Sequence, residues 1–386
     1  MVRILILTVS HGAAHRRVAE ALRKALVELD PTLTVQVEDV LTHVTRWFRA
    51  YYNSYEIPLR YCPALWGWIE GLQHEGSSTS PGWLYRLGAQ PLFRFIDEFR
   101  PDVVVATETG VCEAAVLAKR SSGARWYLVG VDGIDVDRAW AQPEVDLYPV
   151  APDPVATDLE AWGVPPEKIV PCGMPLDPAF LSQPDRSAAR QHLGVAPDIP
   201  LLLVLFGGTG FGRPRAILRE LAKVTRPFQA VLITGRNERL WREAESAARG
   251  RGNCRVLGWV DNMHEWLTAA DFVLNKPSGL ALLEAMACGV PFLALDPLPG
   301  NERRHCELIE RWGVGRWVRG HADLAPVVEQ LLAEPESLNR MSERARSLSR
   351  PRAAYDAAEA ILKLLGDYSG SPSGPGRMLQ TSTRSG

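Results

Sequence analysis

The stretch KPSGLALLEAMACGVP, residues 276–291, decides the fold of this chain. It follows the short apolar run 272–274, which is typical of a buried strand. Ser278 and Gly279 form a turn at which a helix can begin, and the Gly-Val-Pro at 289–291 ends that helix before another apolar run. The stretch therefore reads as strand, turn, helix and strand, the repeating unit of a parallel α/β sheet.

The start of this expected helix has the chemistry of an anion site. Free N–H groups and the positive end of the helix dipole can hold a diphosphate there. Glu284, one to two turns along the helix, could accept hydrogen bonds from both hydroxyls of a ribose. Gly and Ser are also common in ordinary strand-to-helix turns, so this stretch alone leaves a purely structural role equally open.

Similar units extend in both directions from this stretch. The apolar runs that predict strands in the N-terminal part are 2–9, 34–40, 102–106, 126–131 and 168–172. Those in the C-terminal part are 201–206, 230–234, 255–257, 272–274 and 292–295. Because helical patterns separate most of these runs, we expect an α/β protein with two Rossmann-like, doubly wound domains.

The expected domains are residues 1–178 and residues 179–366, the second including the C-terminal helices. Residues 367–386 are rich in Ser, Gly and Pro and are predicted to form a disordered tail. Within the first domain, the segment of about 42–91 is an insertion rich in Trp and Tyr, interleaved with arginines. Its aromatic side chains could fill a helical core, or they could form a surface that meets a bilayer or a lipid-like acceptor.

Composition excludes several classes of protein. The net charge of -2 gives no electrostatic reason to expect a nucleic-acid partner. The six cysteines are scattered without a close pair, which fits a reducing compartment and argues against disulfides or a zinc site. Residues 1–10 are expected to form a first strand rather than a signal peptide. Since no apolar run approaches the ~20 residues that span a bilayer, we expect a protein that is soluble or lies on a membrane surface.

Further candidate ligand-binding segments follow other expected strands. The loop GGTGFG at 207–212 suits close approach to a phosphate, and Arg236 and Asn237 follow the next strand. Val260 could read the edge of a base through its backbone, whereas Asn262 could cap the next helix. Asn301 and Glu302 could bind sugar hydroxyls after the strand at 292–295, although Pro-Gly is also a common turn. The glycine loop with Arg236 also permits an NADP-dependent oxidoreductase, as an alternative.

A general base is expected in the N-terminal domain. Reaction at a substrate hydroxyl requires a group that takes its proton, and a histidine suits this role. His15 follows the loop after the first strand, although it could equally be a structural residue at the start of a helix. Asp132 and Asp137 are the carboxylate candidates.

These motifs, in this order and spacing, resemble the monogalactosyldiacylglycerol synthases and processive diacylglycerol glucosyltransferases, relatives of the lipid II-forming N-acetylglucosaminyltransferase. The resemblance runs from about Arg3 to Arg304 and is strongest in 258–263, 270–291 and 299–302. The PALWGW segment at 63–68 is similar to the family's Pro–Lys–Leu–Trp–Gly stretch.

The resemblance implies a GT-B fold with a central cleft and a UDP-sugar bound by the C-terminal domain. It implies transfer with inversion that needs no metal or other cofactor. It also implies a lipid acceptor such as diacylglycerol and a cytoplasmic protein held peripherally at the inner face of the membrane.

The family's roles carry over to particular positions. Expected donor-binding residues are Gly208, Thr209, Gly210, Arg236, Asn237, Val260, Asn262, Met263, Ser278, Gly279, Leu280, Glu284, Gly300, Asn301 and Glu302. Expected acceptor-binding residues are Gly12, Ala13, Trp66 and Trp68. His15 matches the histidine of the family's first glycine loop, and Asp132 matches its aspartate.

The sequence departs from the family pattern at several of these points. Ser278 to Ala281 replaces Gly-Gly-Leu-Thr, and Asn301 and His305 replace glutamine and asparagine. Gly-Ala-Ala-His at 12–15 has one glycine fewer than usual. These changes leave the hexose unassigned. A UDP-sugar isomerase on the same scaffold is a second alternative.

Overall fold

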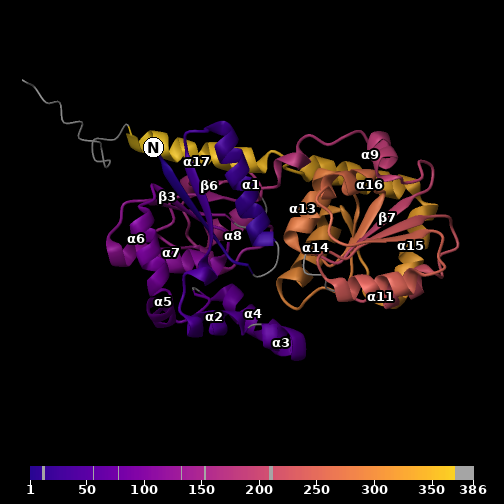
Figure 1. The fold of residues 1–386 in the computed structure, drawn as a ribbon, viewed down its shortest axis with the longest axis horizontal. Coiled ribbons are helices and arrows are strands. Elements are labelled where there is room, and N and C mark those ends of the chain that lie inside the picture. Colours follow the sequence, from indigo (N-terminus) through magenta and orange to yellow (C-terminus); the bar gives the residue numbers. More distant parts are fainter. Residues whose placement is uncertain are drawn as a thin grey trace, which may run out of the picture.

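The structure of the protein is a computed structural model. It describes residues 1–10, 14–54, 56–76, 78–131, 133–151, 154–207 and 212–369. Figure 1 shows two lobes side by side, the N-terminal lobe in indigo to magenta and the C-terminal lobe largely in orange. Each lobe has its own parallel sheet, as the alternation of apolar runs and helices predicts.

The N-terminal sheet has the strand order β2-β1-β3-β4, with all neighbours parallel. Strand β1, one of the two inner strands, is almost completely buried because helices cover both faces of the sheet, and residues 4–7 have no exposed surface. A short parallel pair, β5 and β6, continues the lobe beyond β4. The strands are β1 (Arg3–Thr8), β2 (Thr34–Asp39), β3 (Val103–Ala106), β4 (Tyr127–Gly130), β5 (Tyr148–Pro149) and β6 (Ile169–Val170).

The C-terminal sheet has the order β12-β11-β10-β7-β8-β9. Counted from the first strand of the lobe, this is the doubly wound order of dinucleotide-binding proteins, in which the order of adding strands reverses between β7 and β10 while all strands stay parallel. Ligands bind such sheets at the carboxyl ends of the strands beside this reversal. The strands are β7 (Leu201–Leu205), β8 (Gln229–Ile233), β9 (Cys254–Leu257), β10 (Phe272–Asn275), β11 (Phe292–Ala294) and β12 (Gly315–Trp317).

Helices of the N-terminal lobe either cover the sheet or form the aromatic insertion. The insertion comprises α2 to α5 and lies along the lower edge of this lobe in Figure 1. The helices are α1 (Ala14–Leu29), α2 (Arg46–Asn53), α3 (Glu56–Tyr61), α4 (Pro63–Glu75), α5 (Gly82–Gly88), α6 (Gln90–Phe99), α7 (Thr109–Ser122) and α8 (Val155–Ala161).

The remaining helices follow residue 185 in the sequence, but the last of them returns to the first lobe. The yellow α17 lies beside α1 in Figure 1, and the Tyr355 hydroxyl donates a hydrogen bond to Glu28 on α1. The helices are α9 (Arg186–Leu193), α10 (Pro214–Leu221), α11 (Glu238–Ala248), α12 (Met263–Ala269), α13 (Gly279–Ala287), α14 (Asn301–Trp312), α15 (Leu324–Ala333), α16 (Pro335–Leu348) and α17 (Ala353–Ser369).

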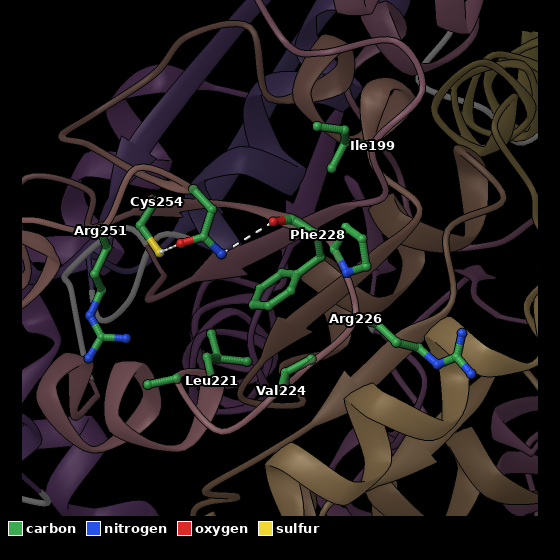
Figure 2. Close-up of a pocket in the computed structure, with 10 residues that line it drawn as sticks. Ile199, Leu221, Val224, Arg226, Phe228, Arg251 and Cys254 are labelled. Carbon is green, nitrogen blue, oxygen red and sulfur yellow. Dashed lines mark hydrogen bonds between the residues drawn. The ribbon is translucent and has the colours of Figure 1, made fainter.

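A cavity of about 470 Å³ lies at the amino-terminal edge of the C-terminal sheet (Figure 2). Ile199, Phe228 and Cys254 line it, and each stands at or just before the start of β7, β8 or β9. Asn253 also lines the cavity, and its side-chain amide donates a hydrogen bond to the Phe228 carbonyl oxygen. Because ligands of doubly wound sheets bind at the opposite edge, this cavity is not the candidate site.

Candidate functional site

The start of α13 lies at the carboxyl edge of the C-terminal sheet, next to the reversal point. Ser278 occupies the N-cap position in an extended conformation, and its side chain makes no capping hydrogen bond. The first N–H groups of α13 are therefore left to other partners. A Cβ atom added to Gly279 would lie 3.5 Å from Ile134 of the N-terminal lobe and 3.7 Å from His305 of α14. Side chains of both lobes thus border the expected diphosphate position.

His305 supports the turn that leads into this helix. Its Nδ1 atom lies 2.7 Å from the carbonyl oxygen of Pro277, which can only accept, so Nδ1 donates. Burial lowers the pKa of His305, because desolvation disfavours the imidazolium. A neutral His305 therefore ties α14 to the residues just before α13.

Glu284 is held by an arginine from the other lobe. It is 3% exposed, and both of its carboxylate oxygens contact the guanidinium of Arg17 on α1, with Nη1 donating to Oε2 over 3.2 Å. Burial raises the pKa of Glu284, while Arg17 opposes this effect. The residue expected to bind ribose is therefore engaged in an ion pair between the lobes, which sequence spacing did not reveal.

His15 lies two residues before Arg17, in the first turn of α1. Its Nδ1 lies 2.7 Å from the Thr107 carbonyl oxygen, so Nδ1 must be the donor. The neutral ring then carries its lone pair on Nε2, where it can accept a proton. Of the carboxylate alternatives, Asp137 accepts from Nδ1 of His74 at 3.0 Å, and Asp132 lies outside the described residues.

The segment before and within the first turn of α14 contains the residues expected to bind the sugar. Glu302 is buried and already paired: Lys276 Nζ lies 2.7 Å from Oε1, and the Leu298 N–H donates to Oε2 at 2.8 Å. Both oxygens of the Glu302 carboxylate therefore bond within the protein, to Lys276 and to the loop that precedes α14. Asn301 is exposed, and its backbone N–H donates to Glu70 of α4 at 2.8 Å.

A cavity of about 300 Å³ lies at the carboxyl ends of β8 and β9. Gly235, Arg236, Gly258 and Trp259 are among the residues that line it, and Val260 follows directly in the chain. The Arg236 guanidinium lies over the Trp259 ring, 4.1 Å from its centroid. The cavity therefore offers a flat aromatic and cationic surface beside the expected base-binding segment.

Two asparagines near this cavity differ in their roles. Asn237 caps α11 by accepting a hydrogen bond from the Leu240 N–H at 3.0 Å. Asn262 occupies the N-cap position of α12, but its side chain donates to Glu265 at 2.7 Å instead of accepting from the backbone. The prediction that the Asn262 side chain caps α12 is therefore wrong, because its amide bonds to the carboxylate of Glu265 in the first turn.

The other expected site residues are distributed as follows. Met263 begins α12, and Leu280 is buried in α13. Trp66 is half-buried on α4, whereas Trp68 is 64% exposed. Gly12, Ala13, Gly208, Thr209 and Gly210 lie outside the described residues.

Family models match the chain in both halves. Residues 15–176 match the family described as "Monogalactosyldiacylglycerol (MGDG) synthase", and residues 216–348 match "Glycosyl transferases group 1". The "Processive diacylglycerol beta-glucosyltransferase" of Bacillus subtilis strain 168 is 26% identical over 369 residues, 94% of this chain and 95% of the relative.

Solved structures resemble the whole chain in fold. The S. aureus MnaA–UDP complex has a TM-score of 0.64 and 16% identity, covering 97% of this chain and 100% of that chain. MurG of Acinetobacter baumannii has a TM-score of 0.58 and 15% identity, covering 94% of this chain and 100% of that chain.

Together these likenesses and the two facing lobes define a glycosyltransferase with the GT-B fold. Within that class, the chain is related to the monogalactosyldiacylglycerol synthases and the processive diacylglycerol glucosyltransferases, which confirms the resemblance seen in the sequence. The isomerase and oxidoreductase alternatives are not favoured, since the matching family models in both halves describe glycosyl transfer.

Proposed function

We propose that this enzyme transfers a hexose from a UDP-sugar to a lipid acceptor, diacylglycerol, with inversion at the sugar carbon. The observation that carries the proposal is the similarity to a diacylglycerol glucosyltransferase over nearly the full length of both chains. The geometry at the boundary of the lobes supports it at three places: the donor site, the proton acceptor and the lipid-facing surface.

The donor lies along the carboxyl edge of the C-terminal sheet in this proposal. Its uracil lies at the cavity beside Arg236, Val260 and Met263, and its diphosphate lies at the start of α13 near Ser278 to Leu280. The hexose lies near Gly300 and Asn301. For Glu284 to bind the ribose hydroxyls, Arg17 must first release it, so donor binding exchanges one partner of this carboxylate for another.

The proton acceptor in this proposal is Nε2 of His15, which its bond to Thr107 leaves available. The acceptor hydroxyl oxygen forms a bond to the anomeric carbon from the face opposite the diphosphate. The bond from that carbon to the diphosphate oxygen breaks, the electron pair leaves with UDP, and the hydroxyl proton passes to His15. The α13 dipole favours the charge that develops on UDP, so the proposed transfer requires no metal.

The lipid side is the aromatic insertion. Trp47 on α2, Trp68 on α4 and Trp83 on α5 are exposed, as are Arg46 and Arg86 beside them. Indole rings suit the boundary between acyl chains and water, and arginines are attracted to anionic lipids. Among the described residues, no helix has the length and apolar character needed to cross a bilayer. We therefore propose peripheral attachment to the inner face of the cytoplasmic membrane.

The decisive experiment is a transfer assay with the purified chain, vesicles containing diacylglycerol, and UDP-glucose or UDP-galactose. A glycolipid product and stoichiometric UDP, unaffected by EDTA, are expected. Turnover of the UDP-sugar into an epimer without any lipid would support the isomerase instead. If calorimetry detects no binding of UDP or of either UDP-sugar, the proposal is wrong.

A further inference from the structure

Helix α4 presents two different stripes to its surroundings. Leu65, Trp68 and Leu72 are exposed and recur at helical spacing, so they form one apolar stripe that faces away from the protein. Gly67, Glu70 and His74 form a second stripe with the same spacing. This second stripe faces the boundary between the lobes.

The second stripe contacts the loop that leads into α14. A Cβ atom added to Gly67 would lie 3.0 Å from the Cβ of Pro299. Glu70 Oε1 accepts hydrogen bonds from the Asn301 N–H at 2.8 Å and from Arg304 at 3.2 Å. A helix of the N-terminal lobe therefore reaches the loop to which we assign the donor hexose.

The second carboxylate oxygen of Glu70 is buried without a partner. Oε2 finds no hydrogen-bond donor among the residues that the structure describes, and the Glu70 side chain is only 13% exposed. Oε2 packs directly on Gly300, where a Cβ atom would come within 1.1 Å of it. Gly300 has a φ of 96°, so the loop depends on glycine for its backbone and for its contact with Glu70.

Pairing with Arg304 does not explain why a carboxylate is buried here. Arg304 already has Asp135, whose Oδ2 accepts from Nε at 2.8 Å and lies 2.6 Å from Nη2. Burial raises the pKa of Glu70, although Arg304 and the Asn301 N–H oppose this effect. A buried acceptor that its own protein leaves unpaired costs free energy, and a ligand that supplies the donor would remove this cost.

We propose that Glu70 is a residue that selects the hexose: its free carboxylate oxygen accepts a hydrogen bond from a hydroxyl of the sugar being transferred. This inference rests on the proposed function, and it adds a contact to the donor from the opposite lobe. Because hexose epimers differ in the direction of a hydroxyl, such an acceptor discriminates between them. The contact also exists only while the two lobes are together.

The test compares binding of UDP with binding of UDP-glucose and UDP-galactose, because UDP lacks the sugar. Calorimetry is performed on the wild type, Glu70→Gln, Glu70→Asp and the control Glu75→Gln, whose side chain is exposed on the same helix. For Glu70→Gln, affinity for the preferred UDP-hexose is expected to fall about tenfold, as for loss of a charged acceptor, with UDP affinity unchanged. Glu70→Asp keeps the charge but shortens the reach, so it also weakens UDP-hexose binding selectively. Glu75→Gln changes neither affinity.

Three results have separate meanings. Unchanged UDP-hexose binding in Glu70→Gln overturns the inference. A parallel loss for UDP and UDP-hexose also overturns it, because Glu70 would then only hold the lobes together. If the wild type binds neither UDP nor UDP-hexose, the proposed function itself fails and the inference fails with it.

Discussion

A single hydrogen bond determines which nitrogen of His15 is available for chemistry. Thr107 accepts from Nδ1, so Nε2 is the atom that can take a proton. We expect His15→Gln to lower kcat by about 10²- to 10⁴-fold, the usual contribution of a general base, and to leave UDP affinity unchanged. The measurement is steady-state transfer together with calorimetry of UDP.

A matched control is His192→Gln, because His192 is exposed on α9. Unchanged turnover in His15→Gln would make His15 structural and would move the base assignment to Asp132 or Asp137.

The pair formed by Arg17 and Glu284 predicts a dependence of stability on pH. Burial raises the folded-state pKa of Glu284 above its ordinary 4.5. This carboxyl group therefore stabilises the folded state below pH 4.5, and that stabilisation is lost as pH rises through the folded-state pKa. Arg17→Gln removes the opposing cation. We therefore expect about 1–3 kcal/mol lower unfolding free energy at pH 8, less than for a fully buried pair because Arg17 is partly exposed.

Urea unfolding at pH 5 and pH 8 measures this effect. The double variant Arg17→Gln/Glu284→Gln removes the charge as well as its partner, so it should recover most of the loss at pH 8. A loss of the same size at both pH values would show that the ion pair is not its cause.

At the scale of the element, the exposed tryptophans of α4 and α5 predict attachment to membranes. Trp68 and Trp83 are 64% and 60% exposed. Burial of each large apolar side chain contributes about 1.5–3 kcal/mol of favourable free energy. The double variant Trp68→Ala/Trp83→Ala should therefore weaken vesicle binding at least tenfold. Sedimentation with phosphatidylglycerol vesicles measures it, and Trp241→Ala on α11 is the control. Equal binding by wild type and the double variant would exclude this surface as the membrane contact.

The elements themselves were largely predictable from local pattern. The apolar runs predict all the longer strands, including β1 and β7. The short strands β6 and β11 also lie in predicted apolar runs. The equally short β5 and β12 were not predicted, and β12, which reads Gly-Arg-Trp, contains no apolar run.

The chemistry of the site was less predictable than its elements. The sequence suggests that Glu302 binds the sugar, but in the structure Glu302 forms an ion pair with Lys276. Glu284 is likewise paired with Arg17. Glu70 and Arg304 meet across 234 positions of sequence, and no spacing rule encodes such a contact. The motifs therefore predict a donor site at the carboxyl edge of the C-terminal sheet, whereas the residues that join the lobes required the structure.

For the whole molecule, α17 makes the N-terminal lobe dependent on the C-terminal end of the sequence. Ile361 has no exposed surface and belongs to the core that includes α1. Ile361→Ala should lower the unfolding free energy by about 2–5 kcal/mol through the cavity it leaves. The exposed Lys363→Ala should change it by less than about 0.5 kcal/mol. Equal effects in urea unfolding would show that α17 is not a structural part of this lobe.

The return of α17 also means that the backbone passes between the lobes twice, once near Asp177 and again between α16 and α17. The two passages lie close together, since a Cβ atom added to Gly173 would lie 2.7 Å from the Cβ of Arg350. Two neighbouring tethers therefore allow the lobes fewer relative motions than a single linker would. A protease cut in either passage would leave the halves covalently joined by the other.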